Sequence, residues 1–228
     1  MNYPFRHFFG LIFASFMFTW FALIVLPWID LGHLRPIQDS DSNDIKPWDA
    51  PGAAHQGELV YASNGCAYCH TQQVRAESSG ADIIRGWGTA TDDSDPKKEI
   101  TRRTYPRDYI WQHQTFLGTN RAGADLSNVA HRYPTAAGLY RYLYDPYIIN
   151  PHCSMPAYKF LFVMQKVRGL PSDDALVLEP VDAPPPGWEI VPTAEAKSLV
   201  AYLLSLNKGY HLPDEYGPVP RTAPDSKS

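Results

Sequence analysis

The chain has 228 residues, enough for one ordinary domain with additions or for two small domains. Its content of 44% hydrophobic and 19% charged residues is typical of a folded protein and excludes a wholly disordered chain. The formal net charge of −4 argues against a nucleic-acid-binding protein, because such proteins usually carry a basic face. Three cysteines cannot form a closed disulfide framework, so a chemical role is considered first.

The first feature along the chain is an apolar segment from Phe8 to Ile29 that contains no charged residue. As an α-helix it would be about 33 Å long, which matches the roughly 30 Å hydrocarbon core of a bilayer. No small-residue cleavage site follows, so we interpret residues 1–30 as an uncleaved transmembrane anchor in contact with membrane lipid. Because Arg6 precedes the segment and Asp30 follows it, the positive-inside rule predicts a cytoplasmic N-terminus and an exported remainder.

The composition of the chain after the anchor indicates three further segments. Residues 31–55 are polar, contain prolines and lack periodicity, which predicts a linker. Residues 56–211 hold the candidate site and the other helical patterns, and residues 212–228 predict a flexible tail. We therefore expect an all-α fold, with one N-terminal transmembrane helix followed by a helical domain with long loops, as the 21 prolines favour.

Residues 66–70 read C-A-Y-C-H and form the most informative motif. Cys66 and Cys69 on one helical turn can add to the two vinyl groups of haem, and His70 then presents an imidazole to the iron. A zinc site would need four ligands, and the sequence contains neither a second C-x-x-C nor an H-x-x-x-H. A thioredoxin-like redox motif would follow a strand, whereas residues 56–62 predict a helix. The motif therefore predicts one covalently attached haem c with its iron.

The second axial ligand of the iron can be sought by elimination. Only Met155 and Met164 lie outside the N-terminus and the anchor, and Met164 lies in an apolar stretch that favours core packing. We favour Met155, because a thioether raises the potential of haem iron relative to a second imidazole and so suits delivery of electrons to an oxidant. Three histidines are alternatives, with His152 the main rival: His113, His131 and His152.

Residues 193–207 predict an amphipathic helix with Thr193 as its N-cap, because apolar side chains recur at helical spacing. Its apolar face consists of Leu199, Tyr202, Leu203 and Leu206. Gly57, four residues before Tyr61 in the first helix of the domain, would let that helix cross close to Tyr202.

These features together resemble cytochrome c, and more closely the membrane-anchored mono-haem subunit of the cbb-type, or C-family, haem–copper cytochrome c oxidases. Residues 69–75 read C-H-T-Q-Q-V-R, where that family has C-H-[ST]-Q-x-[IV]-R. Residues 117–126 read L-G-T-N-R-A-G-A-D-L, where the family has a stretch like L-G-[ST]-K-R-T-G-P-D-L. Residues 155–158 read M-P-A-Y, as in the family, and residues 172–192 are expected to be an insertion.

The resemblance implies a cytochrome c-like haem domain on the periplasmic side of the bacterial inner membrane. It implies a non-catalytic electron-transfer subunit of a proton-pumping terminal oxidase. The implied partners are a polytopic catalytic subunit with haem b and copper, and other cytochrome c subunits or soluble cytochrome c donors. Electrons would pass from these donors through haem c to haem b, where oxygen is reduced.

Two other functions remain open at this point: the anchored cytochrome c subunit of a nitric oxide reductase, and a free-standing membrane-tethered electron shuttle. Two arginines, Arg75 and Arg121, are expected to bind the haem propionates, because guanidinium groups bind carboxylates bidentately. The alternative for both is a solvated surface arginine. Cys153 is left without a partner and is interpreted as a small buried hydrophobic residue.

Overall fold

The computed structural model describes residues 3–39, 43–49, 52–112 and 114–212. The chain forms two compact units, one up to Pro36 and one from Ile37 onward. The second unit begins inside residues 31–55, the stretch predicted as a linker, and part of that stretch is paired as strands. Of the tail predicted at residues 212–228, everything after Leu212 lies outside the described residues.

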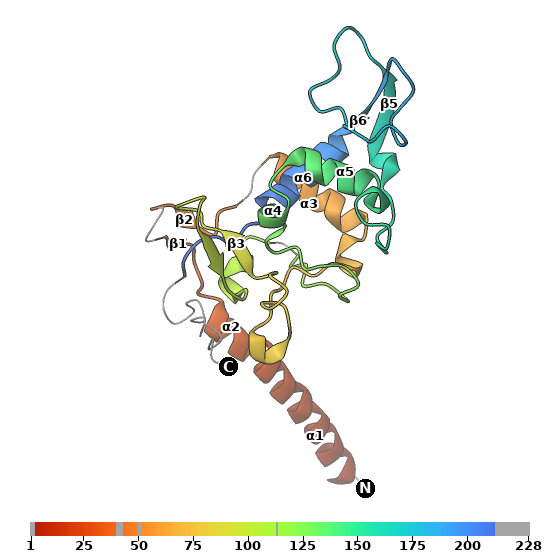
Figure 1. Ribbon diagram of the computed structural model, residues 1–228. Helices are drawn as coiled ribbons and strands as arrows, with labels where there is room; N and C mark the ends of the chain where they lie inside the picture. Colours follow the sequence, from red (N-terminus) through yellow and green to blue (C-terminus); the bar gives the residue numbers. More distant parts are fainter. Residues whose placement is uncertain (1–2, 40–42, 50–51, 113, 213–228) are drawn as a thin grey trace, which may run out of the picture. The chain divides into compact units, whose positions relative to one another are not determined.

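The first unit is helical along most of its length. It consists of α1 (Tyr3–Trp20), a π-helical turn η1 (Phe21–Val25) and α2 (Leu26–Leu31) (Figure 1). The π turn ends two residues before Pro27, which lacks an N–H and crowds the carbonyl four residues before it, and this explains the widened turn.

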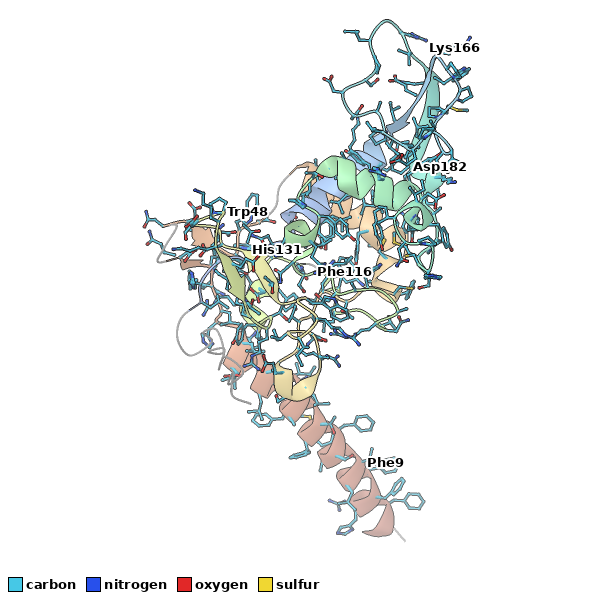
Figure 2. The ribbon with its side chains drawn as sticks, in the orientation of Figure 1. Phe9, Trp48, Phe116, His131, Lys166 and Asp182 are labelled. Carbon is cyan, nitrogen blue, oxygen red and sulfur yellow. The ribbon has the colours of Figure 1, made fainter. Side chains whose placement is uncertain are left out.

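The helical segment Phe5–Leu31 is long and apolar enough to cross a membrane. Its large apolar side chains are exposed, as Figure 2 shows for Phe9. Such a surface is stable in hydrocarbon and unfavourable in water. The helix therefore fits a membrane anchor.

The second unit is built around the helices α3 (Ala53–Ser63), α4 (Val129–Arg132), α5 (Ala136–Tyr144) and α6 (Ala194–Ser205). Helices α3 and α6 pack side by side, and α4 and α5 pack against α6 (Figure 1). Between them run long loops with short 3₁₀ turns at η2 (Cys66–Tyr68), η3 (Glu77–Ser79), η4 (Pro106–Tyr109), η5 (Pro146–Ile148) and η6 (Lys159–Leu161).

The crossing of α3 and α6 occurs where the sequence predicted it. A Cβ atom on Gly57 would lie 1.9 Å from the Ser198 carbonyl oxygen and 2.7 Å from the Tyr202 Cβ, so only glycine permits this approach. One turn further along α3, the rings of Tyr61 and Tyr202 are in contact, with their centroids 5.4 Å apart and their planes tilted by 56°. The close helix crossing is therefore confirmed.

The predicted last helix is also confirmed. The Thr193 side chain accepts a hydrogen bond from the Ala196 amide, which makes Thr193 the N-cap. The helix ends at Ser205, two residues before the predicted end. The reason is that the Asn207 side chain hydrogen-bonds both the N–H and the C=O of Thr91 and so leaves the helix.

The core lies between these helices. It includes Phe116, labelled in Figure 2, and the apolar face of α6. The buried residues of α6 are Ala196, Leu199, Val200, Tyr202 and Leu203. A continuous apolar cluster of this kind is what holds short helices together, because single helices of this length are marginal in water.

The expectation of an all-α fold is wrong in one respect, because the described residues of the second unit form three antiparallel two-stranded sheets. They are β1 (Ile37–Gln38) with β2 (Ile45–Lys46), β3 (Thr89–Thr91) with β4 (Glu99–Thr101), and β5 (Phe162–Lys166) with β6 (Trp188–Pro192). Strands this short carry little alternation, so hydrophobic periodicity could not reveal them. They satisfy the backbone hydrogen-bonding groups of loops that helices leave without partners.

The β5–β6 hairpin includes part of residues 172–192, the predicted insertion, and extends away from the helices (Figure 1). Lys166 lies at its far end (Figure 2). Only the first residue of β5 reaches the core, where the Phe162 ring packs edge-to-face on Tyr144. Met164 is 54% exposed. The prediction that Met164 packs in the core is therefore wrong, because the hairpin carries it away from the helices.

A buried ion pair fixes the loop that contains η4. The Arg102 guanidinium donates to both carboxylate oxygens of Asp108, and the Tyr105 amide and the Tyr210 hydroxyl also donate to that carboxylate. Burial alone would raise the pKa of Asp108, but the attraction of Arg102 outweighs it and lowers the pKa to about 2. This network joins β4, η4 and the segment after α6.

We expect Gly57→Ala to destabilise the folded chain by about 1–3 kcal/mol, because the added methyl group forces α3 away from α6. Chemical unfolding of the full chain in detergent, followed by far-ultraviolet circular dichroism, measures the loss. Gly138→Ala in α5 is the matched control. Its Cβ would lie 3.1 Å from the Thr135 hydroxyl oxygen and would meet no backbone atom. Equal stability of the two variants would contradict the close crossing.

Candidate haem site

One cavity of the second unit brings together residues that the sequence analysis singled out. It has a volume of about 550 Å³ and is lined by Cys66, Cys69, His70 and Met155. This volume is within the range of small-molecule and cofactor sites. Apolar side chains of α3, α4, α5 and α6 contribute much of the wall: Tyr61, Val129, Leu139, Leu143, Leu199 and Leu203. The C-x-x-C-H motif and the distant methionine loop therefore face one apolar space.

The two motif cysteines follow α3 on a tight turn. Gly65 starts the turn with φ +69°, a conformation that favours glycine, and the His70 amide closes it by donating to the Cys66 carbonyl at 3.0 Å. Burial raises the pKa of the Cys66 thiol to about 11. Redox C-x-x-C motifs depend on a depressed thiol pKa, so this shift argues against the thioredoxin-like alternative.

His70 is held in one orientation by the backbone of a distant loop. Its Nδ1 is 2.8 Å from the Ala124 carbonyl oxygen. Because a carbonyl oxygen only accepts, Nδ1 carries the proton and Nε2 keeps a free lone pair. Burial lowers the pKa of His70, although the Ala124 carbonyl acts in the opposite direction. The ring is therefore a neutral imidazole whose Nε2 can coordinate a metal ion.

Gly123 makes room for this ring. A Cβ atom at position 123 would lie 2.3 Å from His70 Cε1 and 2.8 Å from Nε2. Any side chain at this position would displace the imidazole. The glycine of the L-G-T-N-R-A-G-A-D-L stretch is thus required by the histidine of the C-x-x-C-H motif.

The two motifs are joined by a row of backbone hydrogen bonds. Amides in the loop 117–126 donate to carbonyls of the segment 67–71, with distances between 2.8 and 3.0 Å. The pairs are Thr119 to Ala67, Gly123 to Cys69, and Leu126 to Thr71. The loop is therefore bound to the cysteine–histidine segment at three points, two of which flank Ala124 and fix the position of its carbonyl.

The side chain of Asp125 also links the loop to the cysteine–histidine segment. Its side chain is fully buried, and its carboxylate accepts from the Thr71 hydroxyl at 2.6 Å and from the Gln73 and Ser127 amides at 2.8 Å. Three donors compensate the cost of burying the carboxylate. The T-Q-Q-V-R and L-G-T-N-R-A-G-A-D-L sequences, which were recognised separately, thus meet at one buried side chain.

Arg75 and Arg121, expected to bind propionates, do not line the cavity. Both pair with the buried carboxylate of Asp82, Arg75 at 3.1 Å and Arg121 at 2.8 Å. Burial would raise the pKa of Asp82, but the hydrogen bond from Arg75 and the charges of both arginines lower it. Arg121 also donates to the Gln73 carbonyl at 2.7 Å. The structure thus gives both guanidinium groups a partner within the protein.

Of the candidates for the second axial ligand, Met155 and His152 line the cavity and Met164 does not. Met155 packs against the helical core, whereas His152 is exposed. His131 lies outside the lining, with its Nδ1 3.0 Å from the Thr91 hydroxyl. His113 lies outside the described residues.

Cys153 also lines the cavity and is half-buried. Its sulfur is 3.6 Å from the Tyr142 hydroxyl oxygen. The structure differs from the interpretation of Cys153 as a small buried hydrophobic residue, because its side chain is half-buried and its sulfur lies near a hydroxyl group. No pattern in the sequence indicates that it lies beside the cavity.

Arg132 lies at the end of α4 in the cavity wall and belongs to none of the motifs described above. One nitrogen of its guanidinium, Nη2, donates to the Asp125 carbonyl. The other, Nη1, is buried without a hydrogen-bond partner among the described residues. No motif or periodicity singles out this arginine, because its position depends on the packing of α4 against α6.

The residues of the cavity fit a haem. Two thiols lie at the spacing for thioether bonds, a neutral imidazole has a free Nε2, and a thioether side chain lies on the same cavity. The mainly apolar wall suits a porphyrin ring.

We expect Asp125→Ala to destabilise the full chain by about 3 kcal/mol or more, because it leaves three donors buried without an acceptor. Urea unfolding in detergent measures the loss. Asp95→Ala is the control, because Asp95 is partly exposed and its ion pair with Lys98 spans 3.8 Å. A loss for Asp125→Ala no larger than the control would show that the carboxylate does not hold the loop.

The comparison with known protein families agrees with this site. A family model described as cytochrome C oxidase, mono-heme subunit/FixO matches residues 37–186, more than half of the chain. The matched range contains the two cysteines, His70, Met155 and the loop 117–126. A search of curated proteins finds no match. The resemblance noted from the motifs is therefore confirmed, and the chain belongs to the FixO family of mono-haem cytochrome c oxidase subunits.

Proposed function

We propose that this chain is the electron-transfer subunit of a cbb-type terminal oxidase. It would take electrons from other cytochrome c subunits or soluble cytochromes c and pass them to haem b of a polytopic catalytic subunit with copper. The observation that carries the proposal is the single apolar cavity onto which Cys66, Cys69, His70 and Met155 all face. The family match supports an oxidase subunit and does not favour the nitric oxide reductase alternative.

In this proposal Cys66 and Cys69 hold one haem c by thioether bonds, and His70 Nε2 is one axial ligand. The Ala124 carbonyl and the glycine at position 123 keep the imidazole in place. Bound haem supplies a single iron that changes between its ferrous and ferric states by one electron. The residues of the chain hold that iron in fixed surroundings, and the apolar wall of the cavity limits the access of water to it.

Met155 is the proposed second axial ligand, and two observations support it over His152. It packs against the helical core, so its position is constrained, and it is followed by Pro156, which restricts the backbone. A thioether favours the reduced iron more than imidazole does. With both axial positions filled by side chains, the chain has no open site for oxygen, so we assign it electron relay and no catalysis of its own.

The same proposal places the anchor in the bacterial inner membrane and the haem domain in the periplasm. Its support is the apolar helix Phe5–Leu31 together with Arg6 before the uncharged segment and Asp30 at its end. Export also suits covalent haem c, because both cysteines must reach the compartment where attachment occurs.

Met155→His should keep six-coordinate iron but lower its midpoint potential, because imidazole is a stronger donor to ferric iron than thioether. The sulfur-to-iron charge-transfer band of the oxidised protein should disappear. Met164→Leu is the control and should change neither the midpoint potential nor the band, since Met164 is exposed and outside the cavity. Loss of the band in the Met164 variant, with retention in the Met155 variant, would reverse the assignment.

Gentle purification of the full chain from membranes tests the function itself. A large polytopic subunit with haem b should accompany the chain, and the chain should keep its haem after denaturing electrophoresis. A free-standing shuttle would instead come out alone. The complex should consume oxygen when reduced by a cytochrome c donor.

Replacing Cys66 and Cys69 together by alanine should abolish donor-driven oxygen consumption while a small reductant that reaches haem b directly restores part of it. The content of the catalytic subunit must be measured alongside, to separate lost relay from lost assembly. Full donor-driven turnover in this variant would refute the relay role. If nitric oxide reduction depended on the chain and oxygen reduction did not, the chain would be assigned to a nitric oxide reductase.

A further inference from the structure

Three chain segments surround the mouth of the haem cavity: residues 64–73, 114–120 and 146–158. The first and the third line the cavity and are exposed there at Cys69 and His152. The second lies beside the first, because backbone hydrogen bonds of 3.0 and 3.1 Å join them. None of the three contains a lysine, arginine, aspartate or glutamate, although 19% of the chain is charged. We call the surface of these segments the mouth face.

The charged residues that border the mouth face are paired within the protein. Arg75 and Arg121 are the first charged residues after two of the segments, and both bind the buried Asp82 carboxylate. Asp145 and Lys159 border the third segment on its two sides, and they pair with each other at 2.9 Å. The surroundings of the mouth therefore present neither a row of free cations nor a row of free anions to a partner.

The mouth face carries large apolar side chains instead. Four of them are between 42% and 68% exposed: Tyr68, Leu117, Tyr147 and Ile149. None of the four lines the cavity, so a ligand bound in the cavity would leave them uncovered. Large apolar groups gathered on a surface are unfavourable in water and mark sites of interaction, and tyrosine is enriched in protein interfaces.

Surface charge separates two kinds of redox partner. A soluble protein that docks briefly gains speed from complementary charges, which steer it to its site from a distance. A protein that stays bound has an interface that is more apolar, with charged residues depleted at its centre. The mouth face has the second character. The anchor fits the same reading, because a chain held in the membrane meets a membrane-bound partner at high effective concentration without long-range attraction.

We propose that the mouth face is the docking surface for a redox subunit that stays bound to this chain and meets it with an uncharged, apolar surface. The inference rests on the proposed function, because a redox partner is expected at this mouth only if the cavity holds the haem. One electron passes at a time from the reduced centre of one protein to the oxidised centre of the other, and no bond or proton is exchanged. A soluble cytochrome c steered by charge would therefore dock elsewhere in the complex.

Hydroxyl-radical footprinting with mass spectrometry tests this surface on the full chain with its haem. The chain is labelled in the complex purified from membranes and, for comparison, alone in lipid nanodiscs that hold one chain each. We expect labelling of Tyr68, Tyr147 and Ile149 to fall on the order of tenfold in the complex, because a packed interface excludes water. The protection should persist from about 0.1 M to about 1 M salt, which shortens the Debye length from about 10 Å to about 3 Å.

Three results would contradict the inference. Equal labelling in the complex and in the nanodisc would show a face that is open to soluble donors. Protection that disappears at the higher salt would show that charges hold the partner. Protection already present in the nanodisc would assign the face to the membrane lipid.

A charge placed on the mouth face tests the passage of electrons. Ile149→Glu should lower donor-driven oxygen consumption per assembled complex on the order of tenfold, because docking would bury an unpaired carboxylate. Ile149→Gln, which is similar in size and uncharged, should keep most of the rate. Ile84→Glu is the matched control and should keep the wild-type rate, since Ile84 is 81% exposed and lies outside the three segments and the cavity lining. If Ile149→Glu fails to accumulate, Tyr147→Glu replaces it.

Equal rates for the mouth-face glutamate variant and Ile84→Glu would refute the docking surface. An unprotected mouth face together with normal donor-driven oxygen consumption would likewise refute this inference while the proposed function stands. A wild-type chain that purifies alone and without covalent haem would instead refute the proposed function, and the inference with it.

Discussion

The site depends on one interaction, the pairing of the loop 117–126 with the cysteine–histidine segment that follows α3. Backbone amides at 119, 123 and 126 donate to the carbonyls of residues 67, 69 and 71, and the buried Asp125 carboxylate binds the same segment through Thr71 and Gln73. Without it, His70 would have no carbonyl acceptor and no fixed ring orientation. The cavity would then have cysteines and a methionine around it but no directed imidazole. The helices form the apolar wall of the cavity, and this loop orients the imidazole of His70.

Buried carboxylates have a wider role in a unit with many loops and few regular elements. Asp82, Asp108 and Asp125 each lie at the junction of segments distant in the sequence, and each accepts several hydrogen bonds. The main apolar cluster joins the helices, and the loops between residues 75 and 112 contribute instead to a smaller cluster of Tyr105, Tyr210 and Leu212. In these loops, buried carboxylates hold the backbone in place by accepting hydrogen bonds from amides and arginines. The amides that they bind have no hydrogen-bond partner in a helix or strand.

The parts that could be predicted from the sequence are those fixed by local spacing. The C-x-x-C-H turn, the helix capped by Thr193 and the crossing at Gly57 each depend on residues a few positions apart or on a missing side chain. The sequence could not show that Asp82 engages Arg75 and Arg121, or that Arg132 lies in the cavity wall, because these contacts depend on how loops fold back. The short hairpins were missed for a related reason, since two to five paired residues leave no periodic pattern.

The pairing of the loop with the motif segment also restricts which changes of length the chain can accept. Residues 74–115 connect the two paired segments, so an insertion there that avoids β3, β4 and the Asp82 and Asp108 contacts lengthens a loop at a small entropic cost and leaves His70 where it is. A deletion of one residue between Gly118 and Leu126 would shift every donor that follows it by one position. The Ala124 carbonyl would then no longer face the imidazole, and Asp125 would lose Thr71. Insertions and deletions should therefore accumulate on the β5–β6 hairpin and in the long loops, while the spacing within 117–126 stays constant.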